Sequence, residues 1–438
     1  MSSPTTWPPS RPRTTAPPPA AYEVEVTLAD KQADPNSPLY SVKSFEELNL
    51  YVVPWPQSAP LIKGIYEMKF TKPSKIQERA LPLLLSDPPK NMIGQSQSGT
   101  GKTAAFVLTM LTRIDPTVEA TQAICLAPAR ELARQIMDVV TSMGKYTDIT
   151  ACFALPGEDS TPSGPIKAHI VIGTPGKLGD LMKRRLINPS KVRVFVLDEA
   201  DNMIDQQGLG DQSLRIRAMM PKTCQIVLFS ATYAERVKQF ADRFAPNANQ
   251  ISLKQEELSV DGIKQFFMDC KDESHKFDVL VALYSLLTIG QSIIFVKRRD
   301  TADEIARRMS AEGHAVISLH GKQEPAERDF VIDSFRSGKS KVLITTNVLA
   351  RGIDILQVNM VVNYDIPLDG AGNPDPETYL HRIGRTGRFG RTGVSINFVH
   401  DRTSWEQMNQ IEQYFNRPIT RVPTDDFEEL ERILRKAI

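Results

Sequence analysis

Residues 95–103, QSQSGTGKT, combine glycines with hydroxyl side chains and one lysine, a composition suited to holding a phosphate chain. The glycines let backbone N–H groups converge on phosphate oxygens, and the N-terminus of a following helix adds its dipole. Lys102 can reach the β- and γ-phosphates, and the hydroxyl of Thr103 can ligate magnesium. Ser96 stands where the strict P-loop pattern has glycine, and the string taken alone also fits an ordinary glycine-rich turn.

Residues 198–201, DEAD, place three carboxylates in one short segment further along the chain. Asp198 can hold magnesium through its water shell, and Glu199 can orient or deprotonate an attacking water. Taken alone, two adjacent carboxylates are more typical of a solvated acidic loop. Because they follow a P-loop, the two strings together predict hydrolysis of a nucleoside triphosphate.

Both strings follow segments that are predicted to be strands. Residues 91–94 end an apolar stretch, and residues 103–113 combine good helix formers with apolar residues at helical spacing. Residues 194–197 are a continuous apolar run, which is typical of a central parallel strand covered on both faces. The carboxylates therefore begin at the carboxyl end of a strand, where ligands bind in open α/β sheets.

Strand-like and helical runs alternate along the chain in two series. The strands of the first series are expected near 123–127, 149–154, 169–173, 193–198, 224–230 and 250–253. Those of the second are expected near 265–269, 292–296, 315–319, 341–345, 359–363 and 394–399. This repeating βα pattern predicts an α/β fold with two tandem domains, each a parallel sheet with helices on both faces.

The domain boundaries follow from changes in composition. Residues 1–40 are rich in Pro, Ser and Thr and are expected to be a disordered tail, because they cannot bury enough apolar surface to fold. The first domain is expected over 41–253 and the second over 263–438. The polar stretch 254–262 between them is expected to be the linker.

The overall composition limits the classes of protein that the chain can be. Its 41% hydrophobic and 24% charged residues are ordinary for a soluble globular protein. The net charge of +1 means that nucleic-acid binding must use a local patch. Four cysteines without metal-ligand spacing indicate a reducing compartment. Without an apolar run of membrane-spanning length, we expect a soluble, intracellular monomer with no membrane insertion.

A third polar string, HRIGRTGR at 381–388, lies in the predicted second domain. Arg385 and Arg388 are three residues apart, so on a helix end they would project to the same side. Guanidinium groups placed there could stabilise transition-state charge on a γ-phosphate, as an arginine finger does. A basic surface helix is the default alternative. The glycines at 384 and 387 argue against it, since each costs about 1 kcal/mol in a helix interior.

In series, these strings resemble the motifs of the DEAD-box RNA helicase family, and the resemblance covers roughly residues 45–425. FTKPSKIQ at 70–77 is similar to the Q motif, whose Gln77 amide can donate and accept at the adenine edge. The other matching strings are PARELA at 128–133, TPGK at 174–177, SAT at 230–232, IIFVKR at 293–298, TTNVLARGID at 345–354 and HRIGRTGR at 381–388. The resemblance implies that both domains are RecA-like.

The resemblance also implies a role for individual residues, with ATP and Mg²⁺ as cofactors. The implied catalytic residues are Lys102, Asp198, Glu199, Arg385 and Arg388. The implied nucleotide-binding residues are Phe45, Lys72, Gln77, Gln97, Ser98, Gly99, Thr100, Gly101, Lys102, Thr103, Gly352 and Asp354, and the magnesium ligands are Thr103 and Asp198. The implied RNA contacts are Pro128, Arg130, Thr174, Pro175, Lys177 and Thr345. Ser230 and Thr232 would couple hydrolysis to domain closure.

Within that family the chain is similar to the nuclear-pore-associated helicases of mRNA export. The residues that carry this likeness include SPLYSVKSFEEL at 37–48, KGIYEMKFTKPSKIQ at 63–77 and DGAGNPDPETYLHRIGRTGRFGR at 369–391. The likeness implies an RNA-stimulated ATPase that remodels messenger ribonucleoprotein particles at the cytoplasmic face of the pore, in cytoplasm and nucleus. The implied partners are mRNA, a nucleoporin and an inositol-polyphosphate-dependent activator. A non-enzymatic RNA-binding scaffold and a DNA-translocating helicase of the same superfamily are the alternatives.

The chain departs from the family pattern at several positions. Ala129 replaces the Thr or Ser of the PTRELA-type motif, which removes one hydroxyl contact to RNA phosphate. Lys177 replaces the Arg of TPGR and keeps the charge without the planar fork. The spacing between Phe45 and Phe70 is longer than the family usually has, through an extra segment near 51–58. Phe45 is the aromatic that would stack on adenine, so this segment bears on its placement.

Overall fold

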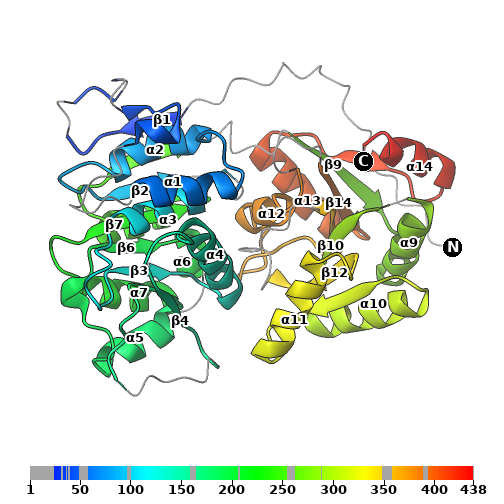
Figure 1. Ribbon diagram of the computed structural model, residues 1–438. Coiled ribbons are helices and arrows are strands. Elements are labelled where there is room, and N and C mark those ends of the chain that lie inside the picture. The colour runs from blue at the N-terminus through cyan, green and yellow to red at the C-terminus, as the bar shows by residue number, and fades with distance from the viewer. Residues whose placement is uncertain are drawn as a thin grey trace. The chain divides into compact units, whose positions relative to one another are not determined.

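The computed structural model describes residues 24–30, 33–35, 37, 40–48, 58–95, 100–157, 164–205, 208–253, 262–287, 289–347, 358–387 and 393–437. These residues form two compact units, one from the described residues up to Leu253 and one from those that begin at residue 262 (Figure 1). We call them the first unit and the second unit. Among the described residues, no helix combines the length and the apolar character needed to cross a bilayer.

The first unit contains an eight-stranded sheet with the order β1-β8-β2-β7-β6-β3-β5-β4. The strands are β1 Val24–Thr27, β2 Met92–Gln95, β3 Ala123–Leu126, β4 Ala151–Ala154, β5 Ile170–Gly173, β6 Val194–Leu197, β7 Gln225–Ser230 and β8 Asn249–Leu253. All pairs except β1 with β8 are parallel. Every residue of the central strands β2, β3, β6 and β7 is buried, because helices cover both faces of the sheet.

Two hydrophobic clusters attach the helices to the two faces of this sheet. The helices are α1 Ser58–Glu67, α2 Lys75–Leu84, α3 Lys102–Thr112, α4 Arg130–Met143, α5 Pro175–Lys183, α6 Ala200–Asp205, α7 Leu209–Ala218 and α8 Glu235–Phe244. One cluster joins α1–α4 to Val194 and Val196 of β6, and the other joins α5–α8 to Phe195 and Leu197 of the same strand. Successive side chains of β6 point to opposite faces of the sheet, so this strand contributes to both layers of the core.

The strand β1 corrects the expectation of an unstructured tail over residues 1–40. It pairs antiparallel with β8, with Val24 opposite Leu253, and the backbone N–H of Ala29 donates to Asn249 Oδ1 at 2.9 Å. Val24 and Val26 pack against the core while the residues that alternate with them are exposed. This period-2 pattern is the signature of a half-buried strand, and the proline-rich composition around it concealed it. Residues 1–23 lie outside the described residues.

The chain that follows β1 is held against α2. The Arg79 guanidinium donates to the carbonyl of Pro35 at 2.6 Å, and the N–H of Val42 donates to the carbonyl of Glu78 at 3.1 Å. The Ser41 hydroxyl donates to the Glu78 carboxylate at 2.8 Å. Both Glu78 and Arg79 directly follow Gln77, so the N-terminal segment braces the helix that carries the Q motif.

The second unit contains a seven-stranded, wholly parallel sheet with the order β11-β12-β10-β13-β14-β9-β15. Its strands are β9 Ile263–Asp269, β10 Gln291–Phe295, β11 Val316–Leu319, β12 Val342–Thr345, β13 Val358–Asn363, β14 Gly393–Val399 and β15 Thr420–Val422. Its helices are α9 Glu273–Leu286, α10 Arg299–Ala311, α11 Pro325–Arg336, α12 Pro376–Ile383, α13 Arg402–Phe415 and α14 Phe427–Arg435. The sequence pattern did not predict β15.

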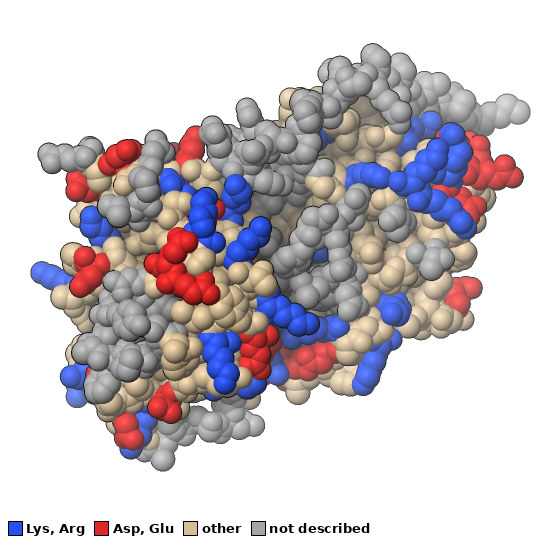
Figure 2. All heavy atoms as spheres, turned by 45° about the horizontal axis from the view of Figure 1, so that its top comes forward, with Lys and Arg blue, Asp and Glu red and all other residues tan. Residues whose placement is uncertain are grey.

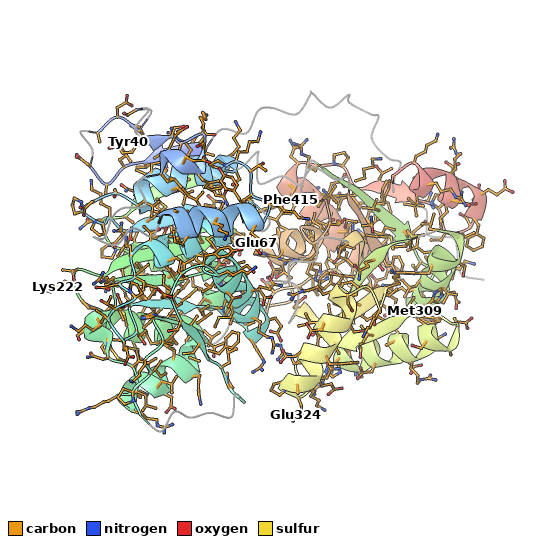
Figure 3. All side chains as sticks on the ribbon, viewed as in Figure 1. Tyr40, Glu67, Lys222, Met309, Glu324 and Phe415 are labelled. Atoms are coloured by element: carbon orange, nitrogen blue, oxygen red, sulfur yellow. The ribbon has the colours of Figure 1, made fainter. Side chains whose placement is uncertain are left out.

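Two clusters again separate the faces of the sheet. Met309 of α10 belongs to the cluster that α9, α10 and α14 form, and Phe415 of α13 packs against the cluster of α12 and α13 (Figure 3). The predicted fold class, two α/β domains with parallel sheets and helices on both faces, is confirmed; the antiparallel β1 is an addition at one edge. Lys and Arg alternate with Asp and Glu over the visible surface, in keeping with the small net charge (Figure 2).

Candidate active site and nucleic-acid interface

The predicted P-loop connects β2 to α3 at the carboxyl end of the first sheet. Gln97, Ser98 and Gly99 lie outside the described residues. Gly101 is the N-cap of α3 and has a φ of 98°, a left-handed conformation that favours glycine. A Cβ at this position would come within 2.6 Å of the Gln77 side-chain nitrogen, so a larger residue would also displace the Gln77 amide.

Gln77 contacts the P-loop directly. Its Nε2 donates to the carbonyl of Gly101 at 2.9 Å, and its Oε1 accepts from the backbone N–H of Ser74 at 2.9 Å. The Ser74 hydroxyl donates to the carbonyl of Thr100 at 2.7 Å. From the sequence we expect this amide to contact adenine, which stays a prediction; the structure adds that the same amide anchors the end of the P-loop.

Lys102 and Asp198 form a buried ion pair. The Lys102 Nζ lies 3.2 Å from Asp198 Oδ1, and the two side chains are 6% and 0% exposed. Burial lowers the pKa of Lys102, but the carboxylates of Asp198, Glu199 and Asp201 outweigh it and raise that pKa above its ordinary value. Burial raises the pKa of Asp198, and the Lys102 ammonium opposes this shift. Among the described residues, neither Lys102 Nζ nor Asp198 Oδ2 has a hydrogen-bond partner with good geometry.

Glu199 follows in a strained backbone conformation, with a φ of 53°. A residue other than glycine in this region costs about 1–2 kcal/mol, and such strain concentrates at functional sites. Asp198 Oδ1 accepts from the Glu199 N–H at 2.9 Å, which stabilises the turn. Asn202 Nδ2 donates to Glu199 Oε2 at 3.3 Å, and Glu199 is only 3% exposed. The turn thus places the carboxylate beside Asp198 at the end of β6.

Asp201 connects the DEAD string to the SAT string. Its Oδ2 accepts from the N–H of Thr232 at 3.0 Å and from the Thr232 hydroxyl at 3.1 Å, and its own N–H donates to the Ser230 hydroxyl at 3.3 Å. Asp201 is fully buried. The structure therefore brings the predicted coupling residues Ser230 and Thr232 to the site, through contacts with Asp201 that the sequence did not predict.

The remaining predicted nucleotide-binding residues occupy different environments. Phe45 begins a short 3-10 helix, is 3% exposed and belongs to the core cluster of the first unit. Lys72 is exposed and Thr103 is half-buried in the first turn of α3. Gly352 and Asp354 lie outside the described residues. The stacking of Phe45 on adenine stays a prediction.

The predicted RNA contacts of the first unit lie at the N-termini of two helices. Pro128 precedes the N-cap of α4, and Arg130 is the first residue of that helix. The Arg130 guanidinium donates to the carbonyl of Pro156 at 2.9 Å. Pro175 is the first residue of α5, and Lys177 lies in its first turn. The N-cap residues Ala129 and Thr174 make no side-chain capping bond within the described structure. The N-terminus of a helix presents backbone N–H groups of a kind that suits phosphate oxygens.

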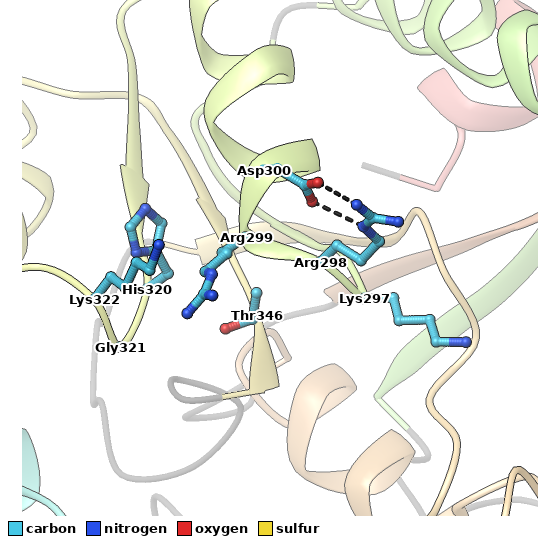
Figure 4. Close-up of a pocket in the computed structure, with 8 residues that line it drawn as sticks. All are labelled: Lys297, Arg298, Arg299, Asp300, His320, Gly321, Lys322 and Thr346. Atoms are coloured by element: carbon cyan, nitrogen blue, oxygen red, sulfur yellow. Dashed lines mark hydrogen bonds and ion pairs between the residues drawn. The ribbon is translucent and has the colours of Figure 1, made fainter.

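A positively charged cavity of about 660 Å³ opens in the second unit (Figure 4). It is lined by Lys297, Arg298, Arg299, Asp300, His320, Gly321, Lys322 and Thr346. Figure 4 shows Arg298 paired with Asp300 through two contacts, one of them at 2.9 Å. The other cationic side chains are Lys297 after β10, Arg299 at the start of α10 and Lys322 in the loop after β11, and they give the cavity a net positive charge.

The sequence predicts one RNA contact in this region, Thr345, which is adjacent to a lining residue but does not line the cavity. Thr345 is fully buried and donates its hydroxyl to the carbonyl of Leu319 at 2.8 Å. The adjacent Thr346 lines the cavity instead. The string IIFVKR ends at Arg298 and pointed to this region, but Lys322 arrives from a loop that carries none of the recognised strings.

Arg382, inside the HRIGRTGR string, is the largest fully buried side chain of the described residues. Its guanidinium donates to Asn347 Oδ1 at 3.1 Å, to Asn363 Oδ1 at 3.0 Å and to the carbonyl of Asp365 at 2.8 Å. Burial lowers the pKa of Arg382 to about 9. These bonds fix α12 to the carboxyl ends of β12 and β13. Sequence reasoning missed this role, since only the fold shows which polar groups surround the guanidinium.

Arg385 follows one turn later at the end of α12. It is 3% exposed, and its Nε donates to the carbonyl of His381 at 3.0 Å. Gly387 has a φ of 71°, and a Cβ there would come within 2.7 Å of the Ile263 side chain. Both the conformation and the space therefore require glycine at this position. Arg388 lies outside the described residues.

Comparison with known proteins shows which families and relatives the chain is similar to. A family model for DEAD/DEAH box helicases matches residues 74–240, and one for the helicase conserved C-terminal domain matches residues 275–390. The chain is 69% identical over 421 residues to the ATP-dependent RNA helicase dbp5 of Schizosaccharomyces pombe, covering 96% of this chain and 82% of that protein.

Solved structures are also similar over most of the chain. Saccharomyces cerevisiae Dbp5 bound to RNA and ADP BeF3 matches with a TM-score of 0.85 and 58% identity, over 90% of this chain and 100% of that one. A Dbp5 variant bound to Nup159, a Gle1 variant, IP6 and ADP matches with a TM-score of 0.65 and 56% identity, over 86% and 98% of the two chains. The family models between them include Gln77, Lys102, Glu199 and Arg385.

Proposed function

Because the chain belongs to the DEAD-box family of ATP-dependent RNA helicases, we propose that it is an RNA-stimulated ATPase that unwinds RNA locally and remodels messenger ribonucleoprotein particles. The observation that carries the proposal is the buried Lys102–Asp198 pair beside the strained Glu199. Two opposite charges are kept out of water at considerable cost. A bound triphosphate would supply further partners for both groups and so offset that cost.

The chain's own residues hold and orient ATP. The Lys102 ammonium, now paired with Asp198, would turn to the β- and γ-phosphates when nucleotide binds. The backbone around Gly101, anchored by Gln77, would cradle the phosphate oxygens. Glu199 would accept a proton from the attacking water or orient it. Arg385 and Arg388, as arginine fingers, would stabilise charge on the transferred phosphoryl group.

The donor set fits a magnesium ion bound together with phosphates. Mg²⁺ prefers oxygen ligands and is usually held by one or two carboxylates plus phosphate oxygens and waters. Asp198 offers the buried Oδ2 that lacks a partner among the described residues, and Thr103 offers a hydroxyl in the first turn of α3. When bound, the ion would neutralise charge that develops on the phosphates. No described cluster of three His, Cys, Asp or Glu residues could hold a metal unaided.

RNA would bind through its backbone. The N-termini of α4 and α5 in the first unit, and the cationic cavity of the second unit, offer backbone N–H groups, lysines and arginines. These groups suit phosphate and 2′-OH oxygens but do not read bases, so we expect binding without sequence preference. The Asp201–Thr232 contact supports a coupling role for SAT, because it joins the segment after β7 to the hydrolytic carboxylates.

The cellular role and partners are proposed from the similar proteins. A related helicase structure contains Nup159, Gle1 and IP6. By this likeness the protein would associate with the nuclear pore at its cytoplasmic face, bind a nucleoporin there, and respond to an activator that depends on an inositol polyphosphate.

The decisive test is ATP hydrolysis with and without single-stranded RNA, beside DNA of the same sequence. We expect stimulation by RNA, little by DNA, and displacement of a short RNA duplex only with ATP. Glu199→Gln should abolish turnover, whereas Glu235→Gln, which makes the same change at the start of α8, should not. Absence of stimulation would favour the scaffold, and equal stimulation by DNA would favour a DNA helicase.

A further inference from the structure

Asn202 makes a contact with Glu199 that has no assigned role. Its side-chain Nδ2 donates to Glu199 Oε2 at 3.3 Å, and its backbone N–H donates to Asp201 Oδ1 at 2.9 Å. Asn202 is 8% exposed and Glu199 3%. The side chain is therefore held inside the site, one turn along α6 from the carboxylate that it contacts.

The contact engages one of the two oxygens of the Glu199 carboxylate. The terminal torsion of a glutamate is broad and roughly two-fold, so an unbound carboxylate samples many orientations. A donor on Oε2 restricts that torsion and leaves Oε1 to accept from a water. An amide donates without adding charge, so it orients the carboxylate while leaving the charge of the site unchanged.

The Asp201 side chain, which contacts Thr232, also holds Asn202 in position. Asp201 accepts from Asn202 through Oδ1 and from Thr232 through Oδ2. A shift of Thr232 would therefore move the Asp201 carboxylate, and with it the residue that contacts Glu199. Asn202 lies between the SAT segment and the hydrolytic carboxylate in a continuous set of hydrogen bonds.

We propose that Asn202 is a positioning residue, which orients the Glu199 carboxylate toward the attacking water and relays the state of the Thr232–Asp201 contact to it. The inference rests on the proposed function, in which Glu199 acts on that water. The charged groups that interact electrostatically with Glu199 are Lys102 and Asp198. Asn202 supplies a neutral donor among them.

Two substitutions separate orientation from general structure. Asn202→Leu removes the donor at similar volume, and Asn202→Asp keeps the shape but places a negative charge against Glu199. Asn188→Asp is the matched control, because it makes the same change at an exposed N-cap in the same unit, where aspartate is equally suitable. For each protein we would measure kcat at saturating ATP and RNA, the KM for ATP, ADP affinity and melting temperature.

We expect Asn202→Leu to lower kcat about tenfold, the order expected for one hydrogen bond to a charged group, while ADP affinity changes less than about twofold. Asn202→Asp should lower kcat at least as much with the KM for ATP unchanged, because it replaces the donor with a negative charge that repels the Glu199 carboxylate. Asn188→Asp should match the wild type in all four measurements.

The proposal would be overturned by a wild-type kcat in Asn202→Leu or in Asn202→Asp. If Asn202→Leu also melts early, Asn202→Asp decides alone, since it keeps the shape of the side chain and a purely structural role would not lower kcat at an unchanged KM for ATP. Glu199→Gln distinguishes a failure of the proposed function from a failure of the role of Asn202. If that variant hydrolyses ATP normally, the proposed role of Glu199 fails; if it is inactive while both Asn202 variants behave as wild type, only the role of Asn202 fails.

Discussion

Gln77→Met should destabilise the first unit even when no nucleotide is present. Methionine conserves the volume of glutamine but carries no amide. The substitution would leave the Ser74 N–H and the Gly101 carbonyl without the partners that they contact at 2.9 Å. Each polar group left unpaired in a buried place costs about 1–2 kcal/mol, so the loss should be about 2–4 kcal/mol. For a unit of this size that is a fall in Tm of about 5–10 °C.

The assay is thermal unfolding of the full chain, followed by intrinsic fluorescence, without nucleotide and then with ADP. Gln239→Met is the matched control. It removes the same amide from an exposed position on α8, where Gln239 only donates to Glu235 at 3.1 Å. Its effect should stay within about 0.5 kcal/mol.

The two roles of Gln77 predict different results. If the amide only contacted adenine, Gln77→Met would melt like the wild type without nucleotide and would differ only with ADP. That result would refute the reasoning from the Gly101 contact. A loss in both conditions, with weaker ADP binding, would show that the amide anchors the P-loop before nucleotide arrives.

Three further predictions follow from contacts in the two units. Arg385→Ala should lower RNA-stimulated kcat about a thousandfold or more, as loss of an arginine finger does, while ATP affinity changes little; equal turnover would contradict the assignment. Thr232→Val removes the 3.1 Å hydroxyl contact to Asp201 and should cost about 1 kcal/mol. It should reduce RNA unwinding per ATP hydrolysed, and an unchanged ratio in a combined assay would argue against coupling. Asn249→Leu removes the partner of the Ala29 N–H and should lower the free energy of unfolding of the first unit in urea by about 1 kcal/mol, unless β1 is not held by this contact.

The sequence predicted what depends on neighbours in the chain and missed what depends on the fold. Continuous apolar runs located β6 and β10, because strands buried on both faces leave an unmistakable local pattern. The three-residue β15, with one buried residue, is too short for any period to show.

The site shows the same limit. Glycines, a lysine and carboxylates in order were enough to select Lys102, Asp198 and Glu199. The burial of Arg382 could not be predicted, because its acceptors come from Asn347, Asn363 and Asp365, which only the parallel sheet brings together.

The pairing of β1 with β8 has a consequence for synthesis of the chain on the ribosome. β1 emerges early, yet among the described strands it pairs with β8 alone, and the Ala29–Asn249 contact joins residues 220 positions apart. Pairings of such long sequence separation form slowly. The strand that carries Val24 and Val26 therefore lacks its partner until nearly the whole first unit has left the exit tunnel. Nascent chains of this protein should expose that segment to chaperones for most of the time taken to translate the unit.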